Sequence, residues 1–181
     1  CSPHNPVGRV WTAEELEKIG DICLKHNVIV ISDEIHADFT FPGHRHIPLC
    51  SLKKEYERIT ITCTAPSKSF NLAGLATSNI LIPNPDLREK FVAEQEAASI
   101  DGANQLGLAA CKAAYTKGAE WLRQLKEYLA GNLSYVREAL KEIPGVSLVE
   151  PEGTYLVWLD LRALNLSEEE QRKLIVEDAK L

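Results

Sequence analysis

A continuous apolar run, residues 28–31, follows directly after a segment that carries the signals of an amphipathic helix. We expect this helix to begin at Thr12-Ala13-Glu14-Glu15, a capping box whose side chains satisfy free backbone amides. It should end at His26-Asn27. A run without polar alternation predicts a strand buried on both faces, as in a parallel sheet. Helix and strand together form half of a βαβ unit, so the chain is expected to be α/β.

Charge and length exclude several functional classes. The 181 residues are 45% hydrophobic, which is enough to bury a core, and the net charge is −6. Without a basic stripe, nucleic acid is not an expected partner. No apolar run reaches the roughly 20 residues that span a bilayer, so a membrane is not expected either. The chain lacks Met and ends inside a helical pattern, so we expect an internal piece of a longer protein.

The cysteines indicate a reducing environment. There are five, an odd number, scattered along the chain without a Cys-x-x-Cys pair. They are typical of reduced thiols in a cytoplasmic protein. The one cluster with metal-ligand residue types is His44-Arg45-His46 near Cys50. Zinc sites use tighter, paired spacing, so no metal is expected.

The rest of the pattern predicts a large and a small domain. We expect strands at residues 58–63, 76–82, 146–149 and 155–160, and helices at 51–56, 86–98, 103–116 and 119–142, with a last helix opened by a capping box at Ser167. The helix at 119–142 should bridge the two parts. Residues 1–118 would then belong to an α/β domain and 119–181 to part of a smaller α+β domain.

One lysine, Lys68, follows the strand expected at 58–63 and lies among hydroxyl-bearing and small residues. Either it is a solvated charge on a polar loop, or it is a covalent anchor. A desolvated lysine loses its proton readily, and its free amine can form a Schiff base with a carbonyl. The hydroxyls of Thr64, Ser67 and Ser69 are short donors of the kind that a phosphate group requires.

Two further polar residues occupy comparable positions. Asp33 ends the apolar strand, and in open α/β sheets ligands bind beyond the carboxyl ends of strands. His36 lies three residues further on. Asn5 lies in a turn that two prolines and Gly8 constrain. Each residue also has a plain structural interpretation, as a turn asparagine, a strand-end acid and a polar neighbour.

The motifs Asn5-Pro6-Val7-Gly8, Asp33-Glu34-Ile35-His36 and Ser67-Lys68, in this order, resemble the class I/II aminotransferase superfamily of fold-type I pyridoxal-phosphate enzymes. The resemblance covers essentially the whole chain. It implies a three-layer large-domain portion plus part of a small domain. It also implies pyridoxal 5′-phosphate as cofactor, small amino-acid substrates and a homodimer.

The resemblance also implies a role for each residue. Asp33 would hold the cofactor's ring nitrogen protonated, because a carboxylate favours the charged pyridinium. Asn5 would donate its amide to the ring hydroxylate. Lys68 would bind the cofactor covalently and later move the α-proton of the substrate. Thr64 and Ser67 are candidates for the phosphate.

Departures from the wider family point to one branch. Many aminotransferases have tyrosine where this chain has His36, and arginine where it has Ala76. Residues 33–39 and 67–75 look instead like the cystathionine β-lyase/cystalysin (MalY/PatB-like) branch, and residues 152–162 resemble its small-domain strand. His36 would then contact the cofactor or assist proton transfer, and Arg162 is expected to be structural.

The branch implies a carbon–sulfur lyase, which releases a thiol, pyruvate and ammonia from L-cystathionine or cysteine-like amino acids. Two alternatives stay open: an aminotransferase, and a regulatory module that keeps the fold without turnover. The fragment alone is expected to have little activity.

Overall fold

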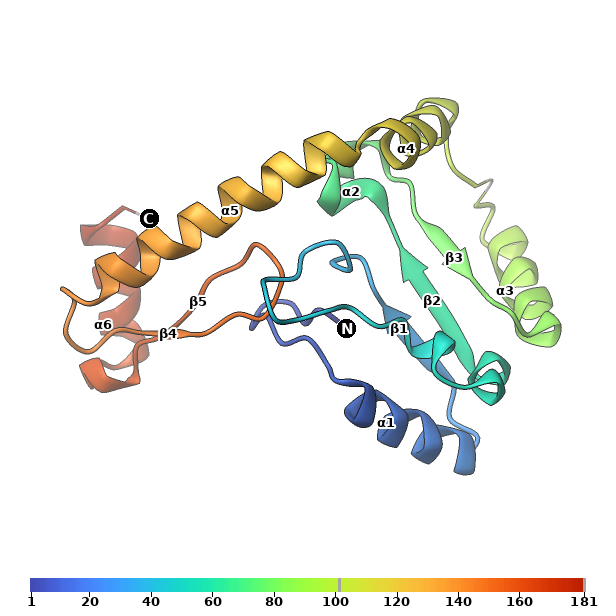
Figure 1. Ribbon diagram of the computed structural model, residues 1–181, viewed down its shortest axis with the longest axis horizontal. Coiled ribbons are helices and arrows are strands. Elements are labelled where there is room, and N and C mark those ends of the chain that lie inside the picture. Colours follow the sequence, from blue (N-terminus) through green and yellow to red (C-terminus); the bar gives the residue numbers. More distant parts are fainter. Residues whose placement is uncertain (101, 181) are drawn as a thin grey trace.

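The computed structural model describes residues 1–100 and 102–180 and shows an α/β arrangement (Figure 1). A three-stranded sheet has the order β1-β2-β3, formed by Val30–Asp33, Thr60–Thr64 and Asn79–Leu81. β1 and β2 are parallel, with Asp33 opposite Cys63, whereas β3 is antiparallel to β2. The carboxyl ends of β1 and β2 therefore meet at one edge of the sheet, as the sequence predicts for a βαβ unit.

Helix α1 (Ala13–Lys25) begins at the predicted capping box. The Thr12 side chain accepts from the Glu15 amide, and the Glu15 carboxylate accepts from the Thr12 amide. α1 packs on the segment between β1 and β2, which holds the short helices η1 (Leu49–Ser51) and η2 (Lys54–Arg58). A core of Leu16, Leu49 and fully buried Tyr56 joins these elements.

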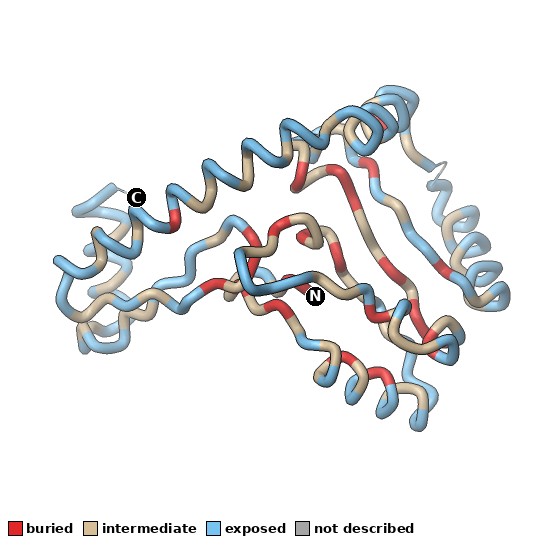
Figure 2. Tube along the Cα trace, in the orientation of Figure 1, coloured by how far each residue is buried: buried red, intermediate tan, exposed pale blue. Residues whose placement is uncertain are grey.

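The prediction that the apolar run is buried on both faces was wrong. The strand is shifted toward the carboxyl side, and Val28, Ile29 and Ile31 are exposed, Ile31 by 68%. Within the described residues β1 pairs only with β2, so its outer edge has no neighbouring strand. Figure 2 shows buried residues along β2 and in the segments around it, including the loops at its carboxyl end and the face of α1.

After β2 the chain forms the one-turn helix α2 (Pro66–Ser69) and the short helix η3 (Ala73–Leu75). Ala76 adopts a left-handed conformation (φ 47°), so the next strand, predicted from residue 76, begins only at Asn79. α3 (Pro85–Ala97) and α4 (Gln105–Lys117) start at asparagine caps, Asn84 and Asn104. Both helices lie where the sequence predicts them.

α5 (Ala119–Leu140) runs from α4 to a second, two-stranded antiparallel sheet of β4 (Ser147–Val149) and β5 (Trp158–Asp160) (Figure 1). The predicted capping box at Ser167 opens α6 (Glu168–Arg172), after η4 (Arg162–Leu164). α6 continues into the π-helical segment η5 (Lys173–Asp178). No helix within residues 1–100 and 102–180 is both long and apolar enough to cross a bilayer.

The loops of the two sheets contact each other. Thr40 forms an isolated antiparallel bridge with Gly153, and the Thr154 amide donates to the Phe39 carbonyl at 2.9 Å. Thr154 is buried and has φ 68°, a conformation that is unusual for a β-branched residue. This contact brings residues 152–155 to the edge of the sheet where β1 and β2 end.

Candidate functional site

The segment after β1 turns back immediately at the edge of the sheet. The Asp33 carboxylate accepts from the Ile35 amide at 3.2 Å, and the Glu34 amide donates to the Cys63 carbonyl at 2.9 Å. Backbone bonds from Ala37 to Glu34 and from Phe39 to His36 then close two tight turns. These turns hold the side chains of residues 33–39 close to the end of β2.

His36 lies in the middle of this segment and is 1% exposed. Its ring centroid lies 5.4 Å from that of Tyr155 and 6.4 Å from that of Phe39. Neither ring nitrogen has a hydrogen-bond partner among the described residues. A buried polar group without a partner is unusual and requires an explanation, such as a missing ligand.

Both predicted charged site residues affect His36. Burial lowers the pKa of the imidazole, the Lys68 ammonium lowers it further, and the Asp33 carboxylate raises it. The geometry places these residues at one edge of the sheet. Asp33 ends β1 opposite Cys63 of β2, Lys68 follows β2 on α2, and the Tyr155 ring beside His36 lines the same cavity as Lys68.

Lys68 is on α2, directly beyond β2, and is partly buried. It lines a cavity of about 350 Å³ together with Ser67, Asn71 and Tyr155. The part of the chain that the structure describes contains no carboxylate that pairs with its ammonium. The amine therefore faces a cavity and is available to a ligand.

Asn5 is exposed at the tip of the opening turn. The turn is closed by bonds between His4 and Gly8 and between His4 and Arg9, each 2.7 Å long. The Ser2 amide donates to the Asp33 carbonyl at 3.0 Å, which fixes the start of the turn beside the end of β1. The structure thus places Asn5 near the same edge, without a direct contact to Asp33 or Lys68.

Residues 150–155 support this turn from the other sheet. The Gly8 carbonyl accepts from the amides of Glu152 and Gly153, and the Glu152 carboxylate accepts from the Val10 amide at 2.7 Å. The same carboxylate binds the Arg9 guanidinium at 3.1 Å. The loop between β4 and β5 therefore holds the Asn5 turn and, through Tyr155, contacts His36.

The three hydroxyl-bearing residues proposed for the phosphate do not share one cavity. Ser67 lines the Lys68 cavity, whereas Thr64 lines a different cavity of about 380 Å³ with Glu34 and Asp38. Ser69 is fully buried and donates to the Asp38 carboxylate at 2.5 Å. Of the three, Ser67 is the one that faces the same space as Lys68.

Other residues considered from the sequence have structural contacts. Arg162 is highly exposed and forms an ion pair with Asp160, which lowers the pKa of that carboxyl to about 2. His46 binds buried Glu34 at 2.9 Å. Within the described ranges no group of three or more metal-ligating side chains comes together.

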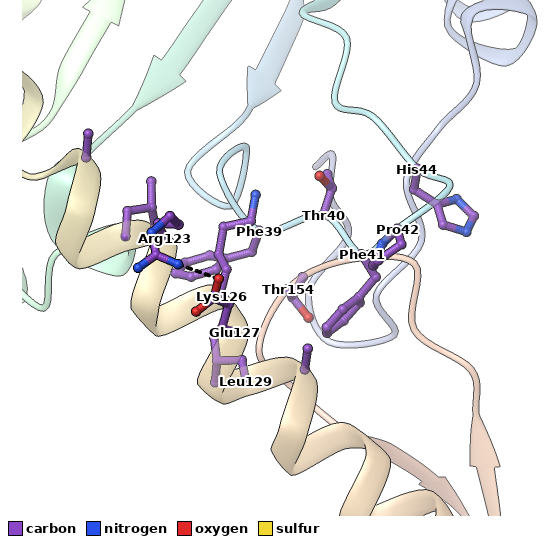
Figure 3. A pocket seen from close by; sticks show the side chains of 13 residues that line it. Phe39, Thr40, Phe41, Pro42, His44, Arg123, Lys126, Glu127, Leu129 and Thr154 are labelled. Carbon is purple, nitrogen blue, oxygen red and sulfur yellow. Dashed lines mark hydrogen bonds and ion pairs between the residues drawn. The ribbon is translucent and has the colours of Figure 1, made fainter.

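A larger cavity, about 660 Å³, lies between residues 39–44 and α5 (Figure 3). Phe39 and Leu129 line both this cavity and the one at Lys68, so the two adjoin. The larger space contains none of the predicted site residues. Its size alone does not identify it as the reactive site.

Sequence patterns missed Tyr155 and Asp38, which contact the predicted residues. Tyr155 is part of the Glu152-Gly153-Thr154-Tyr155 motif, yet nothing local shows that its ring meets His36. Asp38 lies two residues after His36, in the turn that follows β1, and this position is a signal that marks it as a candidate site residue. The contacts themselves depend on tertiary structure.

Comparison with known proteins identifies the family. Residues 1–180 match the family described as "Aminotransferase class I and II", and the chain belongs to it. The chain is 42% identical to cystathionine beta-lyase PatB of Bacillus subtilis and 37% identical to protein MalY of Escherichia coli, in each case over its full length. It covers 47% and 46% of those proteins, so it spans about half the length of these relatives.

A solved structure supports the same family assignment. Cystalysin from Treponema denticola, which contains a pyridoxal 5′-phosphate cofactor, superimposes with a TM-score of 0.94 at 40% identity, over 100% of this chain and 46% of that one. The predicted fold class, an α/β portion of a fold-type I enzyme, is confirmed. The division at residue 118 stays a prediction.

Proposed function

We propose that the protein containing this chain is a pyridoxal-phosphate-dependent carbon–sulfur lyase acting on L-cystathionine or cysteine-like amino acids. The observation that carries the proposal is that Asp33, His36 and Lys68 lie at one edge of the sheet, with an imidazole whose nitrogens have no partner among the described residues. PatB, named a cystathionine beta-lyase, and cystalysin support the choice of branch.

The residues present fit this cofactor. Lys68 offers an amine to a cavity, Asp33 offers a carboxylate at a strand end, and His36 offers buried nitrogens that have no partner in the described part of the chain. Ser67 adds a hydroxyl at the same cavity, where a phosphate needs donors. Thr64 is a weaker candidate for the phosphate, because it lines the neighbouring cavity.

When bound, pyridoxal phosphate supplies an electron sink for the pair left behind when a proton leaves Cα. Lys68 would attach to the cofactor through its amine and then, once free, take the α-proton. Asp33 would hold a proton on the ring nitrogen, and Asn5 would donate to the ring oxygen. His36 would contact the cofactor or assist proton transfer beside Lys68.

The reaction breaks the Cβ–S bond of the amino acid. The thiolate leaves with the electron pair and takes up a proton, and water hydrolyses the three-carbon remainder to pyruvate and ammonia. We further propose a cytoplasmic homodimer. The chain alone should have little activity, since it spans about half of its relatives.

An aminotransferase is the second candidate, because the family as a whole carries that description. It predicts steady keto-acid formation with an amino acceptor and no release of thiol. A regulatory module without turnover is the third candidate, and it predicts cofactor binding with neither product.

The test uses the full-length protein with L-cystathionine and measures pyruvate and thiol together. We expect Lys68→Ala to abolish cofactor attachment and to lower the rate by about 10²–10⁴-fold, the range for loss of a general base. Lys90→Ala, an exposed lysine on α3, is the matched control and should leave the rate unchanged. Keto acid without thiol would favour the aminotransferase, and equal rates for both variants would refute the proposal.

A further inference from the structure

The turn that carries Lys68 cannot fix its own geometry. α2 has four residues, and its N-cap residue Ala65 provides no side-chain hydrogen bond. Helices this short are not stable by themselves, because a single turn forms too few hydrogen bonds to offset the conformational entropy lost in fixing its backbone. The orientation of Lys68 must therefore depend on contacts from outside the turn.

Two such contacts meet at Ser69, the residue after Lys68. Its hydroxyl donates to the Asp38 carboxylate at 2.5 Å, and its carbonyl accepts from the Trp121 indole at 3.3 Å. Ser69 is fully buried, so water does not compete for these groups. Trp121, on α5, is 55% exposed and uses its indole nitrogen to hold this turn.

Asp38 belongs to the segment that carries Asp33 and His36. Pairing between this segment and the end of β2 stops at the bond from Glu34 to the Cys63 carbonyl. Beyond that point, the hydrogen bond between Asp38 and Ser69 connects the segment to the lysine turn. This bond therefore limits how far the Lys68 amine can move relative to the Asp33 carboxylate.

We propose that Asp38 is a positioning residue that acts through Ser69 to orient the Lys68 amine. The inference rests on the proposed function, in which Lys68 is the cofactor-attaching amine. A hydrogen bond to a charged group is stronger than a neutral one, and leaving the partly buried Asp38 carboxylate without its donor would be costly. Both properties suit a bond that keeps a reactive group in place.

The experiment uses the full-length holoenzyme and the variants Asp38→Ala, Ser69→Ala, Asp38→Ala/Ser69→Ala and Asp38→Asn. Thr60→Val is the matched control, because Thr60 is also fully buried and its hydroxyl donates to the Tyr56 carbonyl at the opposite end of β2. The readouts are the pH midpoint of the visible absorption of the bound cofactor, the cofactor affinity and the melting temperature.

We expect Asp38→Ala and Ser69→Ala to move the pH midpoint and to weaken cofactor binding by roughly tenfold, the size expected for one charged hydrogen bond. The double variant should be no worse than the singles, because both remove the same bond. Asp38→Asn keeps an acceptor and should stay near wild type. Thr60→Val should lower only the melting temperature.

A purely structural role predicts the opposite pattern. If the Asp38 and Ser69 variants lower the melting temperature as Thr60→Val does, with an unchanged midpoint and affinity, the inference is overturned. If Ser69→Ala fails to fold, the inference is tested by Asp38→Ala and Asp38→Asn alone, through the difference in their pH midpoints and cofactor affinities. If the wild-type protein shows no cofactor absorption that depends on Lys68, the proposed function and this inference are both refuted. If the wild type shows that absorption and the variants keep its pH midpoint and the cofactor affinity, only this inference is refuted.

Discussion

The ring of Tyr155 lies 5.4 Å from the imidazole of His36, although the two residues belong to opposite halves of the chain. Tyr155 also meets Phe39 edge-to-face at 5.2 Å. The contact joins the loop after β4 to the segment after β1. It excludes water from one side of His36, and so it contributes to the burial that lowers the histidine pKa.

We expect Tyr155→Ala to raise the pKa of His36 toward its ordinary value, because burial is the largest cause of its depression. Stability should fall by about 1–2 kcal/mol through loss of aromatic packing, because Tyr155 is only partly covered (38% exposed). Tyr155→Phe keeps the ring and should change both quantities little. NMR titration of His36 and denaturant unfolding check these outcomes, with exposed Tyr128→Ala as the control. An unchanged His36 pKa in Tyr155→Ala would contradict the prediction.

Acid should destabilise the cofactor-free protein through His36. Its folded-state pKa is lowered, so the unfolded chain takes up the proton first. The free energy of unfolding keeps its full His36 contribution above about pH 6.5, the pKa of histidine in the unfolded chain. It falls on acidification and levels off once the pH is below the pKa of His36 in the folded state. One such group contributes at most about 1.4 kcal/mol per pH unit.

His36→Phe should remove this part of the slope. His26, an exposed residue at the end of α1, offers the control substitution His26→Gln, which should keep the wild-type slope. Denaturant unfolding of the full-length protein at several pH values measures the effect. Parallel curves for wild type and His36→Phe below pH 6.5 would show that another group is responsible.

Local signals predicted local structure well. The capping boxes at Thr12 and Ser167 need only residues three positions apart, and both helices begin there. The parallel pairing of β1 with β2 places Asp33 and Lys68, which lie at and beyond their carboxyl ends, at one edge of the sheet, and their roles toward a cofactor stay predictions. These features depend on neighbours in sequence or on general sheet topology.

Contacts between distant segments were not predictable in the same way. The bond from Trp121 to Ser69 requires α5 to cross the lysine turn, and no spacing rule contains that information. Hydropathy also misjudged Ile31, because an apolar run indicates that a strand prefers burial and does not show which element covers it. Partner identity is set by the tertiary fold.

Substitution of Gly8 should lower stability for two reasons, its positive φ and the close packing around it, and a comparison with Gly43 separates them. Its φ is +80°, and a Cβ there would lie 2.7 Å from the Pro151 Cβ and 2.9 Å from the Gly153 carbonyl oxygen. Gly43 has a similar φ of +93°, but within residues 1–100 and 102–180 no atom lies within 4 Å of a Cβ built there. Gly43→Ala should therefore cost about 1–2 kcal/mol of backbone strain. Gly8→Ala should cost about 1–3 kcal/mol more, because of crowding.

Gly8→Ala should also weaken cofactor binding, because the displaced turn carries Asn5. Gly43→Ala should leave the affinity unchanged. Denaturant unfolding and a cofactor titration on the two variants distinguish the effects. Equal losses of stability in both would mean that the contact with Pro151 and Gly153 relaxes without cost.

Glycine-to-alanine substitutions within the helices α1 and α5 should change stability in opposite directions. A Cβ on Gly20 in α1 would lie 2.5–2.8 Å from ring atoms of Tyr56. That ring is fully buried, and its hydroxyl bonds to the Glu17 carbonyl and the Asp21 carboxylate, so it cannot move away easily. For Gly131 in α5, no atom of the described residues lies within 4 Å of such a Cβ.

Gly131→Ala should therefore raise the free energy of unfolding by about 0.5–1 kcal/mol, the difference in helix propensity. Gly20→Ala gains the same propensity but forces the Tyr56 ring to shift, which costs about 1–3 kcal/mol, so its net effect should be destabilising. Urea unfolding of both variants measures the two changes. A stabilised Gly20→Ala would mean that α1 can move outward from Tyr56, and the core of Leu16, Leu49 and Tyr56 would then be less tightly packed than the distances indicate.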